Sequence, residues 1–360
     1  MGAGGRITRA TLPGLAAVAA VFLLANTAPA AAQTHRLKLR PLSATATESI
    51  RLFNPPVRDR VRAAPFRARA ASRAEAHSAD TRFRTQDGYE IPVSVSSDYT
   101  PDPNVEQGYV NFLGSLVHST ELGKISIYIA TPSQIEDTFC GQGALACYVG
   151  DSQQMFVPGV GEHSDPPVQF LIAHEYGHHI ELNRSNSPWS AYDQGAKRWA
   201  THENVCALER RHKVKTDYFN DPSEAFAESY ADMQYPGVDF IYTPLLKPDQ
   251  GAFDAIKADV LQPWQGPQPL VLHGSFHAHG RAARSYRVQT PLDGTASFQV
   301  SSSDGASYRL RVRAGGREIR RRSVHPAGVA NYTICGQRAL TVQVTRVAGS
   351  GPFTITSAIP

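Results

Sequence analysis

The sequence is poor in several features, and each shortage excludes a class of structure. Four cysteines occur in 360 residues and none forms a Cys-x-x-Cys pair, which excludes a zinc site built from such pairs. One stretch of 12 small and apolar residues, 14–25, lies near the start, and no later run approaches the roughly 20 apolar residues that a membrane-spanning helix needs. Internal repeats are not evident. A membrane-spanning protein and a repeat array are therefore not expected.

The beginning of the chain has the pattern of a secretory signal peptide. Arg6 and Arg9 precede the apolar stretch, and the small residues Ala28-Pro-Ala-Ala-Ala32 follow it. We predict a signal peptide over 1–32, cleaved after Ala30 or Ala32. The mature protein is then expected to be secreted, extracellular and free of the membrane.

A basic segment follows the signal peptide. Between positions 35 and 85, 12 Lys or Arg stand against 4 Asp or Glu, and the segment is rich in Ala with little periodicity. We predict a disordered leader over 33–85, which is a pro-segment that is removed, a solvated linker or a segment that binds anionic surfaces. This segment and the two signal-peptide arginines together carry ten net positive charges. The formal net charge is +4 for the whole chain and −6 for the chain without them. Nucleic-acid binding is therefore not expected.

The most informative motif is the pentad His174-Glu-Tyr-Gly-His178. It lies in the run 169–182, whose apolar residues are spaced as in an amphipathic helix. On a helix, His174 and His178 lie one turn apart on the same face and can bind one ion. Glu175 lies beside that face, where its carboxylate can accept a proton from a metal-bound water. The pentad indicates a zinc (Zn2+) hydrolase.

Two histidines do not complete a catalytic zinc site, so a third ligand must come from elsewhere in the chain. The metzincin continuation of the motif is excluded, because Glu181 and Arg184 stand where it needs Gly and His. Downstream, the run 220–232 begins with a helix start signal and places acidic residues at 224, 228 and 232 on one helical stripe.

The segment Glu224-Ala-Phe-Ala-Glu228-Ser-Tyr230, placed at this distance after the pentad, resembles the gluzincin arrangement, and within it the pattern of the lethal-factor-like branch. The resemblance covers roughly residues 85–245. It implies a zincin-like catalytic fold, peptidase chemistry on a peptide or protein substrate, and Glu224 as the third metal ligand. Glu228, one turn further on, is implied to orient a ligand histidine.

A second assignment of the ligand stays open on helix physics. If Asp221 is the N-cap and Pro222 the first helical residue, Glu224 falls where a capping-box glutamate folds back onto the helix start. Glu228 would then bind the metal and Asp232 would be its supporting carboxylate. The resemblance favours Glu224.

Other residues complete the expected site. Tyr218 and Tyr230 flank the presumed ligand and are candidates for stabilising the oxyanion, whereas His179 follows a ligand and points to a different face. The run 124–131 alternates like a strand, and 144–149 with 154–157 has the pattern of a hairpin. We expect this hairpin to supply an edge strand along which an extended substrate can pair.

The four cysteines agree with export and allow three pairings. Cys140 and Cys147 can close a short loop, and the remaining pair, Cys206 and Cys335, would close a long one that joins two domains. We predict these two disulfides, with free thiols as the alternative.

A second domain is predicted after the Pro- and Gly-rich stretch 262–269. Short alternating runs separated by turn residues are typical of a β-sandwich, and they occur at 285–288, 296–300, 308–312, 340–344 and 353–355. The layout resembles the bacterial pre-peptidase C-terminal type of domain. Its arginine-rich run, 311–322, is interpreted as a solvated face.

The sequence thus predicts an α+β zincin-like catalytic domain over 86–262 and an all-β sandwich over 270–360. The function expected is that of a secreted zinc metallopeptidase with Glu175 as general base and His174, His178 and Glu224 as metal ligands. Two alternatives remain. One is a secreted binding protein that keeps a zincin scaffold without activity, and the other is a zinc hydrolase of non-peptide acyl substrates.

Overall fold

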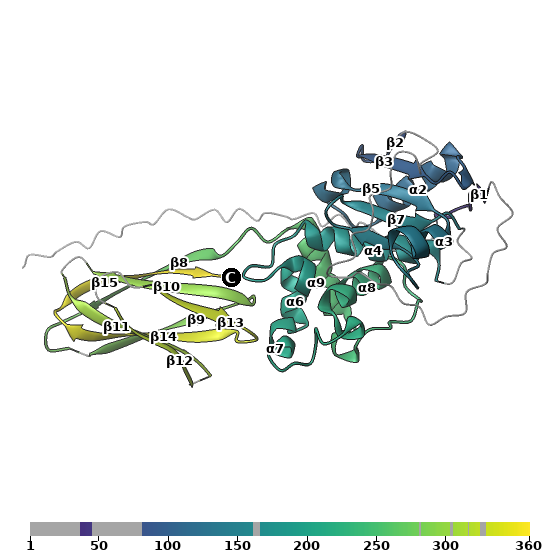
Figure 1. Ribbon diagram of the computed structural model, residues 1–360. Coiled ribbons are helices and arrows are strands. Elements are labelled where there is room, and N and C mark those ends of the chain that lie inside the picture. Colours follow the sequence, from purple (N-terminus) through teal and green to yellow (C-terminus); the bar gives the residue numbers. More distant parts are fainter. Residues whose placement is uncertain are drawn as a thin grey trace, which may run out of the picture.

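The structure is a computed structural model in which the predicted signal peptide and most of the predicted leader lie outside the described residues. The described residues are 37–44, 81–160, 166–280, 282–302, 305–315, 317–324 and 329–360, the side chains of 317–324 excepted. Figure 1 shows an α+β part and a β-rich part that lie end to end. Among the described helices, none is long and apolar enough to cross a bilayer.

A five-stranded sheet forms one layer of the α+β part. Its strand order is β2-β3-β5-β7-β6, in which β3, β5 and β7 run parallel while β2 and β6 run antiparallel at the two edges. The predicted strand and hairpin are confirmed as β5 and as β6 with β7. The bounds are β2 (Thr81–Arg84), β3 (Glu90–Val95), β5 (Ser126–Ala130), β6 (Cys147–Val149) and β7 (Gln154–Pro158).

Helices pack on this sheet and on one another (Figure 1). The longer ones are α2 (Pro103–Ser115), α4 (Val168–Leu182), α8 (Pro222–Gln234) and α9 (Gln250–Leu261). Shorter elements connect them, namely η1 (Thr120–Lys124), α3 (Pro132–Gln134), η2 (Ile135–Phe139), α5 (Ala191–Gln194), α6 (Lys197–His202), α7 (Val205–Glu209), η3 (Tyr218–Asn220) and η4 (Pro244–Leu246).

Helix α4, which carries the pentad, lies in the middle of the α+β part. The sequence predicted an amphipathic helix, but α4 is buried on nearly every side and only its last residue, Leu182, is exposed. A helix in this position contacts the sheet on one side and other helices on the other. The polar residues of the pentad are therefore buried together with the apolar ones.

A short piece of the predicted disordered leader is ordered. Residues 37–44 lie along the α+β part, and Leu39 and Leu42 are buried in its core. Strand β1 (Ser43–Ala44) pairs with β4 (Tyr99–Thr100), and Thr81–Arg84 forms β2 of the main sheet. The prediction of disorder over 33–85 is therefore wrong at both places, because buried leucines and strand pairing stabilise segments that look basic overall.

The C-terminal part consists of two four-stranded antiparallel sheets with strand orders β13-β10-β15-β8 and β12-β11-β14-β9. Side chains alternate between a buried apolar face and a solvent face, as in β11, where Tyr308, Leu310 and Val312 are buried. The bounds are β8 (Gln268–Phe276), β9 (Ala283–Gln289), β10 (Gly294–Ser302), β11 (Ser307–Ala314), β12 (Arg317–Val324), β13 (Val329–Ile334), β14 (Ala339–Ala348) and β15 (Gly351–Ile359).

The five predicted sandwich strands all occur, as parts of β9, β10, β11, β14 and β15. Strands β8, β12 and β13 were not predicted. Strand β8 begins within the Pro- and Gly-rich stretch, at Gln268, and β12 lies in the arginine-rich run. Strand β12 lacks the apolar alternation on which the prediction relied, whereas β8 has it at Leu270, Leu272 and Phe276, in a stretch that its Pro and Gly residues marked as a linker.

Covalent and polar contacts join the two parts of the chain. The disulfide between Cys206 of α7 and Cys335 after β13 links them, and the Cys140–Cys147 disulfide closes the short loop before β6, so both predicted pairings are confirmed. The amide of Asp293 donates to Thr201 Oγ1 over 3.1 Å, and Arg338 Nη2 donates to the Thr201 carbonyl over 3.3 Å.

Candidate metal centre

The two histidines of the pentad and Glu224 form a buried cluster between α4 and α8. One ligand atom from each of these three residues lies within 4.8 Å of the others. Glu224 Oε2 is 3.4 Å from His174 Nε2 and 3.6 Å from His178 Nε2. The structure therefore brings together the three residues that the resemblance implied as metal ligands.

The close approach of α4 and α8 depends on Gly177. A Cβ atom at this position would lie 2.7 Å from the Cα of Ala227, which real Cβ atoms do not tolerate. Glycine in the pentad and alanine in α8 thus let the two helix backbones touch. This contact places Glu224, one turn before Ala227 on α8, opposite the imidazole rings of α4.

Each imidazole is held from its far side by a carboxylate. His174 Nδ1 lies 3.0 Å from Glu228 Oε2, and His178 Nδ1 lies 3.0 Å from Glu181 Oε2. Ser223 Oγ donates to the same Glu181 oxygen over 2.8 Å. A carboxylate that accepts the Nδ1 proton fixes the tautomer in which Nε2 carries the free lone pair, which is the arrangement typical of metal-binding histidines.

The start of α8 explains why Glu224 faces the histidines. Asp221 is the N-cap, with its side chain accepting from the Ser223 amide over 2.9 Å, and Pro222 is at N1. The capping box does not form, since the Asp221 amide donates to the Tyr218 carbonyl instead. The alternative with Glu228 as ligand is therefore not the arrangement seen, because Glu228 contacts Nδ1 of His174 and Asp232 contacts neither ring among the described contacts.

The protonation states of the cluster follow from burial and from the opposing charges. Burial alone would lower the pKa of His178, but Glu224 and Glu181 outweigh it and raise the pKa to about 10. Burial would raise the pKa of Glu224, but the two histidines lower it to about 2. Burial raises the pKa of Glu181 to about 8. At neutral pH, with no metal bound, His178 thus holds a proton beside the Glu224 carboxylate, and a divalent cation would replace that proton when it binds.

Glu175 is fully buried on α4 beside the ligand pair. His179, four residues further on, is buried rather than solvent-exposed, and it contacts the Tyr148 hydroxyl of β6 at 2.8 Å and the Glu121 carbonyl at 2.9 Å. His179 therefore fixes β6 on α4.

The two predicted tyrosines have different surroundings. Tyr230 is buried and donates to the Val117 carbonyl over 2.7 Å, so the prediction that it faces the reacting group is wrong. Tyr218 is half-buried, and its hydroxyl lies 2.8 Å from that of Tyr242. Tyr242 in turn donates to Glu224 Oε2 over 3.1 Å, with its ring stacked 6.3 Å from that of His174.

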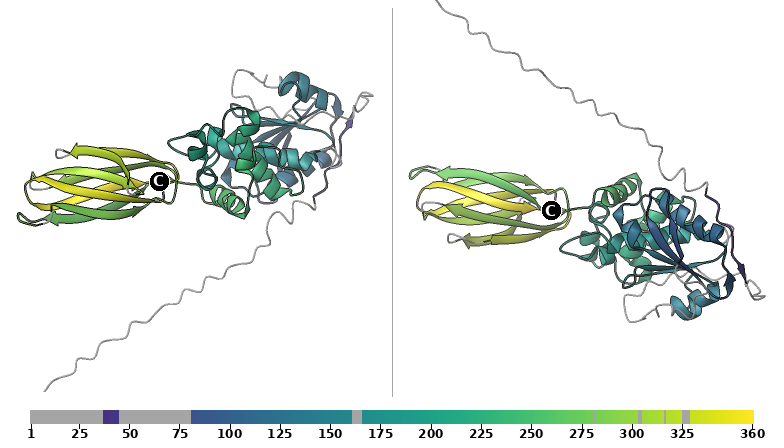
Figure 2. Two further views of the ribbon diagram at one scale, coloured as in Figure 1. Left: turned by 90° about the horizontal axis from the view of Figure 1, so that it is seen from below. Right: turned by 90° about the horizontal axis from the view of Figure 1, so that it is seen from above.

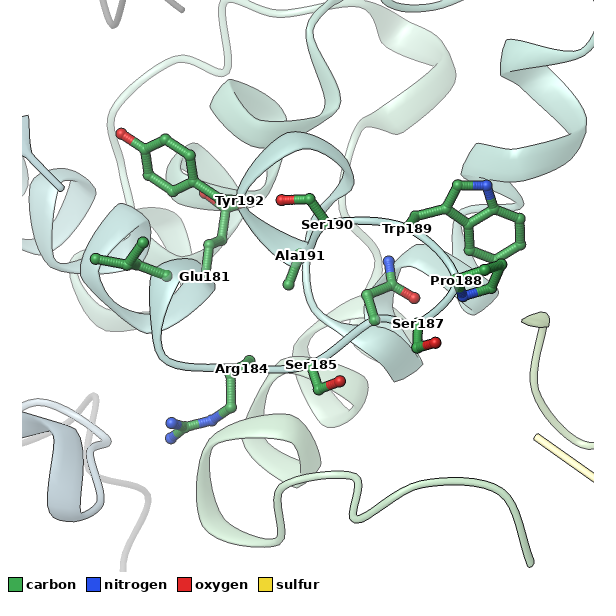
Figure 3. A pocket seen from close by; sticks show the side chains of 11 residues that line it. Glu181, Arg184, Ser185, Ser187, Pro188, Trp189, Ser190, Ala191 and Tyr192 are labelled. Atoms are coloured by element: carbon green, nitrogen blue, oxygen red, sulfur yellow. The ribbon is translucent and has the colours of Figure 1, made fainter. Parts of the chain in front are cut away.

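A pocket of about 270 Å³ lies beyond the C-terminal end of α4 and is lined mainly by the loop 184–192. Figure 3 shows Glu181 and Tyr192 on one side of the pocket and Pro188 and Trp189 on the other. The ring of Tyr192 also lies 6.4 Å from that of His178. The pocket is therefore adjacent to the cluster.

Sequence reasoning missed several residues of this site. Glu181 had a usable signal, since it stands three residues after His178, a spacing that brings side chains together on a helix. Ser223 also had a usable signal, because it stands at the expected start of the helix that carries Glu224. Tyr242 had no local signal, because it reaches Glu224 from a loop after α8.

Comparisons with known proteins reach only parts of the chain. No family model matches the chain, and no curated protein matches it. Among solved structures, a pre-peptidase C-terminal domain of a collagenase from Bacillus anthracis is similar over 24% of this chain and 87% of that domain, with 13% identity and a TM-score of 0.22.

Two further solved structures have comparable scores. A periplasmic inhibitor of g-type lysozyme from Aeromonas hydrophila is similar over 28% of this chain and 92% of that one, with 17% identity and a TM-score of 0.22. A mitogen from Yersinia pseudotuberculosis is similar over 26% and 87%, with 11% identity and a TM-score of 0.22. At these scores the similarities carry no functional assignment.

Proposed function

We propose that this chain is a secreted zinc metallopeptidase with a zincin-like catalytic domain. His174, His178 and Glu224 would hold the metal, and Glu175 would act as the general base in the hydrolysis of peptide bonds. The observation that carries the proposal is the buried triad of two imidazoles and one carboxylate, with each imidazole held at Nδ1 by a second carboxylate.

The donor set fits zinc in particular. Two histidine nitrogens and one carboxylate oxygen are ligands of catalytic zinc sites, in which three protein ligands leave a fourth position for water. Burying this many ionisable groups costs several kcal/mol unless something compensates them. A bound divalent cation supplies that compensation.

When bound, zinc lowers the pKa of a coordinated water to about 7 and polarises the carbonyl of the substrate. The chain's own groups then handle protons and position. Glu175 accepts a proton at its carboxylate and passes it to the leaving amine. Glu228 and Glu181 keep the imidazole rings oriented. Tyr218, linked to Glu224 through Tyr242, is the remaining predicted donor for a developing oxyanion.

The edge strand β6 is the proposed binding site for the main chain of the substrate. It is the last strand of the five-stranded sheet and contacts α4 through Tyr148 and His179. An extended peptide can pair with such an edge by main-chain hydrogen bonds. This favours a peptide or protein over a small acyl substrate.

Secretion is part of the proposal. Its support is the signal-peptide pattern of residues 1–32 and the presence of two disulfides, which persist in oxidising compartments.

The test compares wild-type protein with Glu175→Gln and with Asp239→Asn, a matched change of an exposed acid outside the site. Each protein is loaded with zinc and incubated with a peptide library and with small esters. We expect peptide cleavage by wild type and by Asp239→Asn, and a loss of about 10²- to 10⁴-fold in Glu175→Gln at unchanged zinc content. Zinc binding without turnover would contradict the proposal in favour of a binding protein, and cleavage of esters alone would favour the non-peptide hydrolase.

A further inference from the structure

Charge is distributed very unevenly between the two parts of the chain. From Gln268 to the end there are twelve arginines and no lysine, against three acidic residues, Asp293, Asp304 and Glu318. Residues 86–360 together carry a net charge of −6, and residues 268–360 contribute nine net positive charges to it. Residues 86–267 are therefore strongly acidic. Beyond position 85, the basic character of the chain is therefore confined to the sandwich.

Several of these arginines gather on one face of the sheet β12-β11-β14-β9. In β11, Tyr308, Leu310 and Val312 are buried against the other sheet, so the alternate residues point outward. Along a strand, every second residue lies about 7 Å from the last. The outward residues form three rows across β9, β14 and β11: Arg287, Thr341 and Arg313; Ser285, Gln343 and Arg311; Ala283, Thr345 and Arg309. We call these nine residues the arginine face.

The arginine face carries four arginines, and on the neighbouring strand β12 the register sets Arg321 opposite Arg311 and Glu318 opposite Arg313. Each of its residues is exposed or half-buried, and none of the nine is acidic. Among the described residues, no ion pair joins Arg287, Arg309 or Arg313 to a carboxylate. Other arginines of the sandwich serve its structure, as Arg338 does with Asp293 and Arg284 does with the Ser275 carbonyl.

We propose that the arginine face binds an acidic polysaccharide, a glycan with repeated sulfate or carboxylate groups, and so holds the protein on an anionic matrix. Guanidinium groups bind sulfate and carboxylate bidentately, and a row of them matches a polymer that repeats its charge. The threonine, serine and glutamine side chains between them can bond to sugar hydroxyls.

The composition of the face favours a glycan over a nucleic acid. Proteins that bind single strands stack the bases on exposed aromatic rings, and the nine residues include none. The aromatic residues of the same strands, such as Tyr308, belong to the opposite, core side. Double-stranded nucleic acids need an element that enters a groove, and the face of a four-stranded sheet is too broad to do so.

The experiment measures binding of the full mature chain to heparin, as a sulfated polysaccharide, with uncharged dextran and poly(dT) as comparison polymers. The variant Arg309→Thr, Arg311→Thr and Arg313→Thr removes three charges while keeping residues suited to a strand. The matched control is Arg82→Ser, Arg210→Ser and Lys213→Ser, which removes three exposed charges from the α+β part. A further variant, Arg309→Lys, Arg311→Lys and Arg313→Lys, keeps the charge.

We expect heparin binding that weakens with salt and falls on the order of 100-fold in the threonine variant, but changes little in the control. The lysine variant keeps the charge but not the bidentate geometry, so its affinity should lie between those of wild type and the threonine variant, and thermal unfolding should show that the threonine variant is folded. Glu175→Gln should bind heparin like wild type, so this inference stands or falls apart from the proposed hydrolysis. Unchanged heparin affinity in the threonine variant would overturn it, as would tighter binding to poly(dT) than to heparin.

Discussion

The interiors of the two parts of this protein differ in kind. The α+β part buries His174, Glu175, His178 and Glu224 near its centre, whereas the sandwich core around Phe298 is apolar. Among the described residues of the sandwich, the buried polar side chains are Thr290, Asp293 and Ser357. The two interiors therefore have different requirements. Buried charged groups need a ligand or polar partners to offset their desolvation, whereas an apolar core needs only close packing.

The largest expected loss of stability comes from truncating a large buried side chain in either core. Phe298 in the sandwich and Phe226 in α8 are both fully buried, so Phe298→Ala and Phe226→Ala should each cost about 3–5 kcal/mol of stability. Phe226 lies between the two glutamates of α8 and packs on Trp199, so its loss should also weaken zinc binding. Denaturant unfolding together with the zinc content of the folded protein measures both effects. Equal loss of zinc in the two variants would contradict the view that only the core of the α+β part supports the metal site.

A smaller change tests the helix contact beneath the site. In an ordinary helix Gly→Ala stabilises by up to about 1 kcal/mol. At Gly177 the new methyl group would press on the α8 backbone, so Gly177→Ala should instead destabilise the protein by about 1–3 kcal/mol and reduce zinc affinity. Thermal unfolding and a zinc titration check this. A more stable variant with unchanged affinity would mean that the two helices do not position Glu224.

The carboxylates behind the imidazoles should have intermediate effects. Glu181→Gln and Glu228→Gln each remove the acceptor for one Nδ1 proton, and each should weaken zinc binding about 10- to 100-fold. Asp232→Asn, on the same helix stripe, is the matched control and should leave affinity unchanged. Competition with a chromogenic chelator gives the three constants. A larger effect from Asp232→Asn would reinstate the alternative register of α8.

The junction between the parts gives an effect on stability that appears only at alkaline pH. Lys197 is buried there, with its ammonium 4.3 Å from the Trp264 ring centre and 2.7 Å from the Ser187 carbonyl, and burial lowers its pKa to about 8. Between pH 8 and the ordinary lysine value of 10.5 the unfolded chain binds more protons than the folded one, so this group makes stability rise with pH.

Relative to Lys197→Met, the wild-type protein should therefore gain up to about 1.4 kcal/mol per pH unit across that window. Urea unfolding at several pH values measures the difference. A constant difference between the two proteins would show that the ammonium is not desolvated.

Local sequence patterns predicted much of this architecture. The pentad, the cap at Asp221, the hairpin before α4 and the Cys140–Cys147 disulfide follow from short-range signals in the chain, and the Cys206–Cys335 pairing follows from the cysteines that remain. The ligand Glu224 needed the resemblance, because its capping-box position argued against it.

Tertiary contacts hid the rest. Leu39 and Leu42 hold residues 37–44 on the α+β part, although the composition of this segment is that of a disordered leader. The order of the segment depends on the core against which these leucines pack. Tyr242 reaches the site from a loop, and strand β12 forms from an arginine-rich run because β11 offers it a partner. Pairing and burial decided these elements, and neither is readable from local periodicity.

The central claim is that two imidazoles of α4 and one carboxylate of α8 bind one zinc ion. Metal analysis after chelation and reloading tests it on wild type, Glu224→Ala and Glu228→Ala. We predict about one zinc per chain in wild type, none in Glu224→Ala, and zinc that is retained but bound more weakly in Glu228→Ala. A wild-type protein that takes up no zinc, or a Glu224→Ala variant that keeps it while Glu228→Ala loses it, would contradict the claim.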